Sequence, residues 1–100
     1  MNSCTDVHII QNMKIEFDLE KAQANLRKHG VSFEEAKTCL LDSFALVRED
    51  PDGRSEVRYV LVGMSDKLHL LTVVYALRGE ETVRLISARK ATRKEEKAYA

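Results

Sequence analysis

Four strand-like segments separated by short turns occupy the second half of this 100-residue chain, and they restrict its fold more than any other feature. The segment 68–77 is almost entirely apolar, which is typical of a central strand covered on both faces. Strands joined by only a few residues run antiparallel, because a parallel connection needs a longer crossover. The chain is therefore predicted to form an antiparallel meander from segments 44–48, 56–64, 68–77 and 82–88.

Two helices are predicted ahead of the meander. Asp18 can cap a helix that continues to about His29, and Gly30 can end it in the left-handed conformation. The sequence SFEE, which begins at Ser32, is a capping box for a second helix to about Leu41. A third helix is expected after the meander, where TRKE is another capping box.

The apolar residues of the first helix predict which of its sides packs inward. Leu19, Ala22 and Leu26 recur at helical spacing and form the expected buried stripe. Ahead of this helix, the alternating stretch KIEFD would turn Ile15 and Phe17 to one side of a short strand. The predicted fold class is therefore α+β, with helices packed around a curved antiparallel sheet of about four strands.

The chain length suits one domain, and the mixture of apolar and charged residues is typical of a soluble globular protein. Residues 1–12 differ in character from the rest of the chain and are expected to be a loosely attached extension, so that residues 13–100 form the domain. No apolar run reaches membrane-spanning length, and no secretory signal is visible. Cys4 and Cys39 lack CxxC spacing, so a reduced, cytoplasmic chain is expected.

Charge is distributed unevenly although the formal net charge is zero. Residues 1–56 hold seven Lys/Arg and eleven Asp/Glu, or −4, whereas residues 57–100 hold nine and five, or +4. A basic face can attract phosphate even when the total charge cancels. The same pattern is also compatible with an ordinary solvated surface.

Common catalytic and metal-binding patterns are missing from the sequence. His8, His29 and His69 lack the spacing of zinc motifs, and the four glycines are isolated rather than gathered in a phosphate-binding loop. No cofactor or metal is therefore expected.

Cations remain as the candidates for chemistry. Arg58, Arg78, Arg84 and Arg89 lie on or at the ends of predicted strands, and guanidinium groups bind phosphate bidentately. Arg78 and Arg84 flank one predicted hairpin turn and should lie close together. Glu56 shares a strand face with Arg58 and is either a general base or an ion-pair partner.

A basic corner precedes Gly30. Arg27, Lys28 and His29 would all interact favourably with the negative end of the first helix. Histidine is also the side chain best suited to proton transfer near neutral pH. Helix capping and proton transfer both remain open for this corner.

The stretches NLRKHGVSFEEA and ISARKATRKEEKAY, with SEVRYVLVG and LLTVVYALRG between them, resemble the BrnT family of bacterial ribonuclease toxins. The resemblance covers Lys14 to Tyr99. Phe17 departs from the tryptophan that often precedes the aspartate in this family, which we interpret as a packing change. The resemblance implies a RelE-like fold, with two N-terminal helices and a short C-terminal one around the sheet.

The resemblance also implies an activity and partners. A BrnT-like chain would cleave messenger RNA, inhibit translation and be neutralised by a BrnA-type ribbon-helix-helix antitoxin. The expected complex is a toxin–antitoxin heterotetramer containing a toxin homodimer, in which only the antitoxin contacts DNA, and no membrane is involved. A non-catalytic protein- or RNA-binding module of the same fold is the alternative.

The hypothesis for the site is a ribonuclease without a metal, in which the RNA 2′-hydroxyl attacks the adjacent phosphorus. This chemistry needs a base, an acid and cations around the phosphoryl oxygens. Two groups of residues are assigned to these tasks: the catalytic candidates Lys28, His29, Glu56, Arg58, Arg78 and Arg89, and the substrate-binding candidates Lys21 and Arg84.

Overall fold

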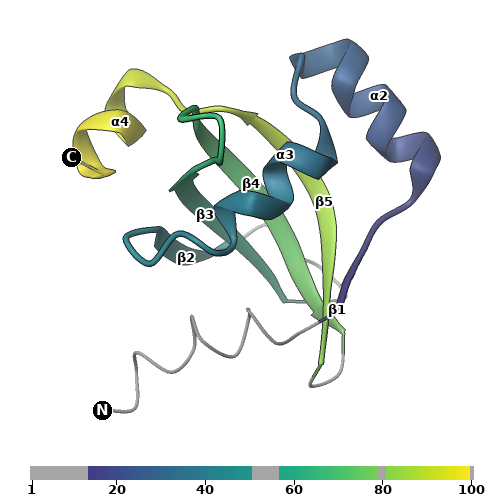
Figure 1. Ribbon diagram of the computed structural model, residues 1–100. Coiled ribbons are helices and arrows are strands. Elements are labelled where there is room, and N and C mark those ends of the chain that lie inside the picture. Colours follow the sequence, from purple (N-terminus) through teal and green to yellow (C-terminus); the bar gives the residue numbers. More distant parts are fainter. Residues whose placement is uncertain (1–13, 51–56, 79–80, 100) are drawn as a thin grey trace.

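A five-stranded sheet and three helices make up the computed structural model, which describes residues 14–50, 57–78 and 81–99 (Figure 1). In chain order the elements are β1 (Lys14–Glu16), α2 (Leu19–His29), α3 (Phe33–Cys39), β2 (Leu46–Asp50), β3 (Arg58–Met64), β4 (Leu70–Arg78), β5 (Thr82–Lys90) and α4 (Arg93–Tyr99). In the described part of the chain, no helix is both long and apolar enough to cross a membrane. The predicted α+β class is confirmed.

Strand order in the sheet is β1-β5-β4-β3-β2. β2 to β5 form the predicted antiparallel meander. β1 is the expected short strand before the first helix, and it pairs with β5 in parallel. The predicted extension at residues 1–12 and the candidate base Glu56 lie outside the described residues, so both remain predictions.

The two faces of the sheet pack against different parts of the protein. One face packs against α3, and its core contains Phe33, Leu40, Leu61, Val73 and Leu85. Figure 1 shows α3 lying across the strands and α2 alongside β5, whereas α4 stands apart from both. The opposite face, which we call the arginine face, carries the strand arginines Arg58, Arg78, Arg84 and Arg89.

Most of the predicted helix ends are present. The Asp18 carboxylate accepts a hydrogen bond from the backbone N–H of Glu20 at 2.8 Å, and Gly30 has a φ of 71°. The Ser32 hydroxyl accepts from the backbone N–H of Glu35 at 3.0 Å. α3 ends at Cys39, slightly before the expected position near Leu41.

The predicted buried stripe of α2 is wrong for its two leucines, whereas Ala22 packs against the core as predicted. Leu19 is 72% exposed and Leu26 is 50% exposed, whereas Asn25 is buried. The Asn25 amide donates to the carbonyl oxygens of Val31 (2.9 Å) and Ala88 (2.8 Å), and it accepts from the Ala88 N–H (3.1 Å). β1 pairs only with residues 82–84, so the Asn25 side chain takes the place of a neighbouring strand beside Ala88.

The capping box at the start of α3 is only half formed, because the Glu35 side chain points elsewhere. Its Oε2 accepts from the Ser65 hydroxyl at 2.6 Å and contacts His69 Nδ1 at 2.8 Å. Burial acts to raise the pKa of Glu35, but these two hydrogen bonds, together with the charges of His69 and Lys67, outweigh it and the pKa is lowered. Glu35 thus ties α3 to the turn between β3 and β4.

Polar contacts hold α4 in place, since none of its seven residues is buried. At its start, the Thr92 hydroxyl accepts from the Glu95 N–H at 3.2 Å and the Glu95 carboxylate accepts from the Thr92 N–H at 2.8 Å, which completes the predicted capping box. At its end, the Tyr99 hydroxyl donates to Asp42 at 2.5 Å, and this bond raises the pKa of Tyr99 to about 12. The helix is therefore fastened at both ends.

Candidate functional site

One row of residues crosses all five strands on the arginine face. The register places Asp50, Arg58, Ala76, Arg84 and Glu16 side by side in β2, β3, β4, β5 and β1. Side chains at directly opposed positions point to the same face of a sheet. Arg58 and Arg84 thus flank the fully buried Ala76, with their Cα atoms about 10 Å apart, two strand spacings.

Arg78 and Arg89 lie on the same face but at different distances from this row. Arg78 is two residues beyond Ala76 on β4, so it lies next to the row, on the strand adjacent to Arg84. Arg89 is opposite Thr72, about 13 Å from the row in the other direction along the strands. The structure therefore groups Arg58, Arg78 and Arg84 and sets Arg89 apart.

Arg58 has an unsatisfied group at the centre of this arrangement. Its Nε is buried and has no hydrogen-bond partner among the residues that the structure describes. A buried donor left without an acceptor costs about 1–3 kcal/mol, and more when the group is charged. Because protein atoms cover this Nε, an anionic ligand would bind Arg58 through its terminal guanidinium nitrogens, which carry most of its donors.

Arg89 is already paired with a carboxylate. Its two terminal nitrogens donate to the Glu95 oxygens at 3.0 and 3.1 Å, and the Thr72 hydroxyl donates to the same carboxylate at 2.8 Å. The hydrogen bonds from Arg89 are the main reason why the pKa of Glu95 falls to about 2. A base this weak is poorly suited to accept a hydroxyl proton near neutral pH.

Glu95 was not among the sequence-predicted site residues. Its position in the TRKE capping box predicted a role at the helix start, which it also performs. The only sequence signal for its second role is that Arg89 and Glu95 are opposite charges at the two ends of one short connection.

Replacing Glu95 with glutamine is expected to destabilise the protein at pH 7 but much less at pH 3. The folded-state pKa of Glu95 is about 2, below its ordinary value of 4.5, so its stabilisation is complete above about pH 5 and is lost as the pH falls. We expect about 1–2 kcal/mol at pH 7, allowing for solvent screening beside an open groove. Urea unfolding at both pH values measures the difference, and a pH-independent difference would contradict the ion pair.

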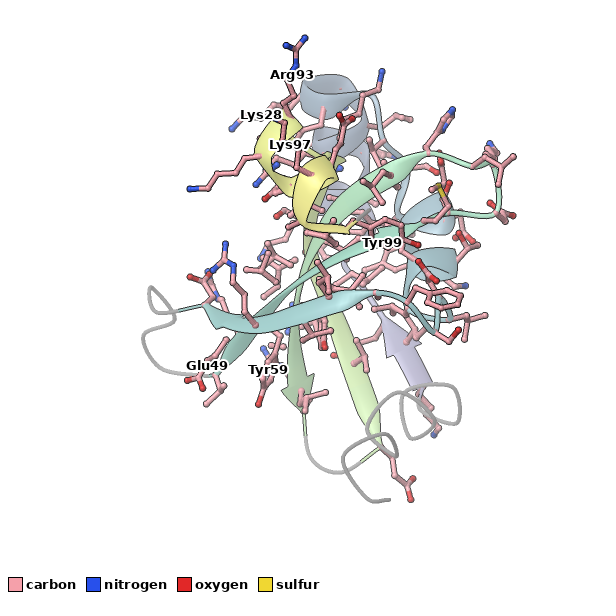
Figure 2. The ribbon with its side chains drawn as sticks, turned by 90° about the vertical axis from the view of Figure 1, so that its left-hand side faces the viewer. Lys28, Glu49, Tyr59, Arg93, Lys97 and Tyr99 are labelled. Carbon is pink, nitrogen blue, oxygen red and sulfur yellow. The ribbon has the colours of Figure 1, made fainter. Side chains whose placement is uncertain are left out.

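The C-terminal end of α2 carries the predicted basic corner. His29 is half-buried and lies on the same side of the helix as Ala22 and Asn25, whereas Lys28 is exposed. Figure 2 shows Lys28 at the same end of the molecule as Arg93 and Lys97, and Figure 1 shows that α2 and α4 lie on opposite sides there. Lys21 lies two turns earlier on the side of Lys28 and is also exposed.

A groove of about 480 Å³ lies between α4 and the outer strands β2 and β3. We call it the α4 groove, and Figure 2 views the molecule from the side that carries α4. Its lining residues are Leu46, Val47, Arg48, Val60, Val62, Thr92, Lys94, Glu95 and Ala98. No cluster of three His, Cys, Asp or Glu side chains that could hold a metal ion occurs within residues 14–50, 57–78 and 81–99.

Comparison with known proteins identifies the family of the chain. Residues 17–95 match the family described as "Ribonuclease toxin, BrnT, of type II toxin-antitoxin system". The 1.1 Å crystal structure of the Brucella abortus ribonuclease toxin BrnT is similar, with a TM-score of 0.60 and 28% identity over 81% of this chain and 99% of that one. A search of curated proteins found no match. The chain therefore belongs to the BrnT family of ribonuclease toxins of type II toxin–antitoxin systems.

Proposed function

We propose that the protein is an endoribonuclease that cleaves messenger RNA without a metal ion and thereby inhibits translation in the cytoplasm. The observation that carries this proposal is the strand register, which aligns Arg58 and Arg84 on either side of Ala76 on one face of the sheet. Family membership supplies the RNA substrate class and the existence of an antitoxin. The arginine face supplies a place where a phosphodiester would be bound.

The reaction begins when the RNA 2′-hydroxyl loses its proton to a base and attacks the adjacent phosphorus. The bond from phosphorus to the 5′-oxygen breaks, and an acid protonates that oxygen, so the products are a 2′,3′-cyclic phosphate and a 5′-hydroxyl. Negative charge grows on the phosphoryl oxygens in the transition state. In this proposal Arg58 and Arg84, with Arg78 beside them, stabilise this charge through directed hydrogen bonds, and their shared sheet face supports the assignment.

The sequence also predicted residues for proton transfer, which requires hydrogen-bond reach of the reacting atoms. Lys28 and His29 end a helix that Asn25 fixes to β5 at Ala88, directly before Arg89 and about 13 Å along the strands from the arginine row, so they lie out of reach of a phosphate held at Arg58 and Arg84. Positioned proton transfer contributes about 10²–10⁴-fold to rates. Glu56, which lies outside the described residues, remains a candidate base, and Lys21 a candidate RNA contact. Because Arg89 is held by Glu95, we assign it to positioning α4 rather than to the reacting phosphate.

The partner proposed for the chain is a BrnA-type antitoxin with a ribbon-helix-helix DNA-binding module. The complex would be a heterotetramer containing two toxin chains, and DNA would contact only the antitoxin. Co-expression of the two proteins followed by light scattering measures this stoichiometry. A complex with one copy of each protein would contradict the tetramer while leaving the ribonuclease activity untouched.

Incubating the purified protein with a single-stranded RNA in excess EDTA tests the activity. We expect cleavage to persist and the products to carry cyclic phosphate and 5′-hydroxyl ends, read by mass spectrometry. Induction of the chain alone in bacteria should arrest growth and fragment transcripts. Folded protein that binds the RNA but leaves it intact would favour the non-catalytic binding module, and activity abolished by EDTA and restored by a divalent cation would contradict metal independence.

A further inference from the structure

The α4 groove opens on the arginine face, next to the arginine row but outside it. Its floor includes Val60 and Val62 of β3, which point to the same face as Arg58. Val60 is two residues from Arg58, about 7 Å along the strand. That separation is comparable to the distance between a phosphate and the base of the same nucleotide, so a ligand held at Arg58 by its phosphate would reach the groove.

The chemical character of the groove matches one nucleoside better than a protein segment. Leu46, Val60 and Val62 provide apolar surface for a base, and Arg48 and Lys94 contribute two cations at its borders. The one carboxylate in the lining, Glu95, already accepts hydrogen bonds from Arg89, Thr72 and the Thr92 backbone N–H. Within the groove lining, a nucleoside would therefore meet two cations and a carboxylate that is already hydrogen-bonded.

The volume of the α4 groove also favours a nucleoside over a protein segment. A volume of about 480 Å³ lies within the range of small-molecule sites, roughly 300–1,000 Å³. An α-helix 10–12 Å wide fills roughly 400–600 Å³ per turn, so the groove would hold about one turn of a helix. One turn is too short to form a stable helical docking contact, whereas the volume is of the size that small-molecule ligands occupy.

We propose that the α4 groove binds the nucleoside adjacent to the phosphate at Arg58, and that it determines which base the enzyme prefers beside the cleaved bond. The inference rests on the proposed ribonuclease function. It adds a specificity site formed by α4, β2 and β3, separate from the arginines that hold the reacting phosphate.

Filling the groove tests the proposal. Ala98 is exposed on α4 and lines the groove, so Ala98→Trp places a large side chain where the base would bind. Using short single-stranded RNAs that differ in the base beside the cut, we expect KM to rise about tenfold and the preference among bases to be lost. Gln23→Trp, at an exposed position on the side of α2 away from Lys21 and Lys28, is the matched control and should retain both values.

A binding measurement separates this inference from the proposed function. Each of the four ribonucleoside 5′-monophosphates is titrated into the wild-type protein and followed by amide NMR. We expect shifts at Val60, Val62 and Ala98 whether or not RNA is cut, so a wild-type protein that binds nucleotides but does not cleave would defeat only the proposed function. Unchanged amide signals, together with wild-type base preference in Ala98→Trp, would overturn the inference. So would an Ala98→Trp variant that loses antitoxin binding but keeps its base preference, because the groove would then be a protein-docking site.

Discussion

Replacing Arg58 with methionine is expected to lower kcat/KM for RNA cleavage by about 10²–10³-fold, the usual effect of removing one donor that stabilises transition-state charge. Methionine keeps an unbranched apolar stem beside the buried Ala76 but removes the guanidinium group. It also removes the buried Nε that lacks a partner among the described residues, so the folded protein should not be destabilised. Initial rates with a fluorescent RNA and urea unfolding measure the two effects together.

Two further variants test whether the effect at Arg58 depends on its guanidinium group and on its position. Arg58→Lys keeps the charge but not the planar fork, so we expect it to recover only part of the lost rate. Lys67→Met removes an exposed cation from the turn between β3 and β4, at the other end of β3 from Arg58, and should stay within about twofold of the wild type, since exposed cations away from the site matter little. A folded Arg58→Met variant with wild-type kcat/KM would exclude Arg58 from the reaction.

Replacing Asn25 with alanine is expected to destabilise the protein by about 3–5 kcal/mol, because three buried backbone groups lose their partners. These groups are the carbonyl oxygens of Val31 and Ala88 and the N–H of Ala88. A domain of this size is stable by about 5–15 kcal/mol, so the loss would consume a large share of the total. Urea unfolding followed by circular dichroism gives the free energy of unfolding directly.

The control for Asn25 lies two residues away on the same helix. Gln23 is exposed, so Gln23→Ala should change the free energy of unfolding by no more than about 0.5 kcal/mol. Asn25→Asp should be at least as damaging as alanine, because a carboxylate cannot donate to the carbonyl oxygens of Val31 and Ala88. A loss below about 1 kcal/mol in Asn25→Ala would show that water satisfies these groups and that Asn25 does not fix α2 to β5.

Local signals in the sequence predicted the elements well. Asp18, Gly30, Ser32 and Thr92 act at the helix ends where their side chains or backbone preferences place them. The meander followed from turn length alone, since a few residues cannot support a parallel crossover. These are interactions between residues close in sequence, and their energies do not depend on the rest of the fold.

Contacts between distant residues were the ones that could not be predicted. The leucines of α2 suggested a buried stripe, but the packed side centres on Asn25, whose partner Ala88 lies 63 residues away. Hydrophobic periodicity counts only apolar residues. It therefore cannot detect a polar side chain such as Asn25, which is buried because its amide forms the hydrogen bonds that a neighbouring strand would otherwise make with β5. Glu35 likewise bonds to Ser65, 30 residues further along the chain, instead of closing its own capping box.

The candidate site was predicted as a set of residue types but not as an arrangement. Strand register decides which arginines share a row, and a shift of one residue would have moved Arg58 to the opposite face. The register groups Arg58, Arg78 and Arg84, whereas Arg89 is held by Glu95. The expectation that all these cations surround one phosphate therefore applies to three arginines, and neither to Arg89 nor to the basic corner at the end of α2.

The location of a bound phosphate tests the central claim most directly. A crystal structure of the protein with a short 2′-O-methyl RNA, which lacks the attacking hydroxyl, would show this location without cleavage. We predict a phosphate on the arginine face, with its oxygens within hydrogen-bond distance of Arg58 and Arg84. An RNA bound instead on the side of the sheet covered by α3, with both arginines facing solvent, would contradict the account.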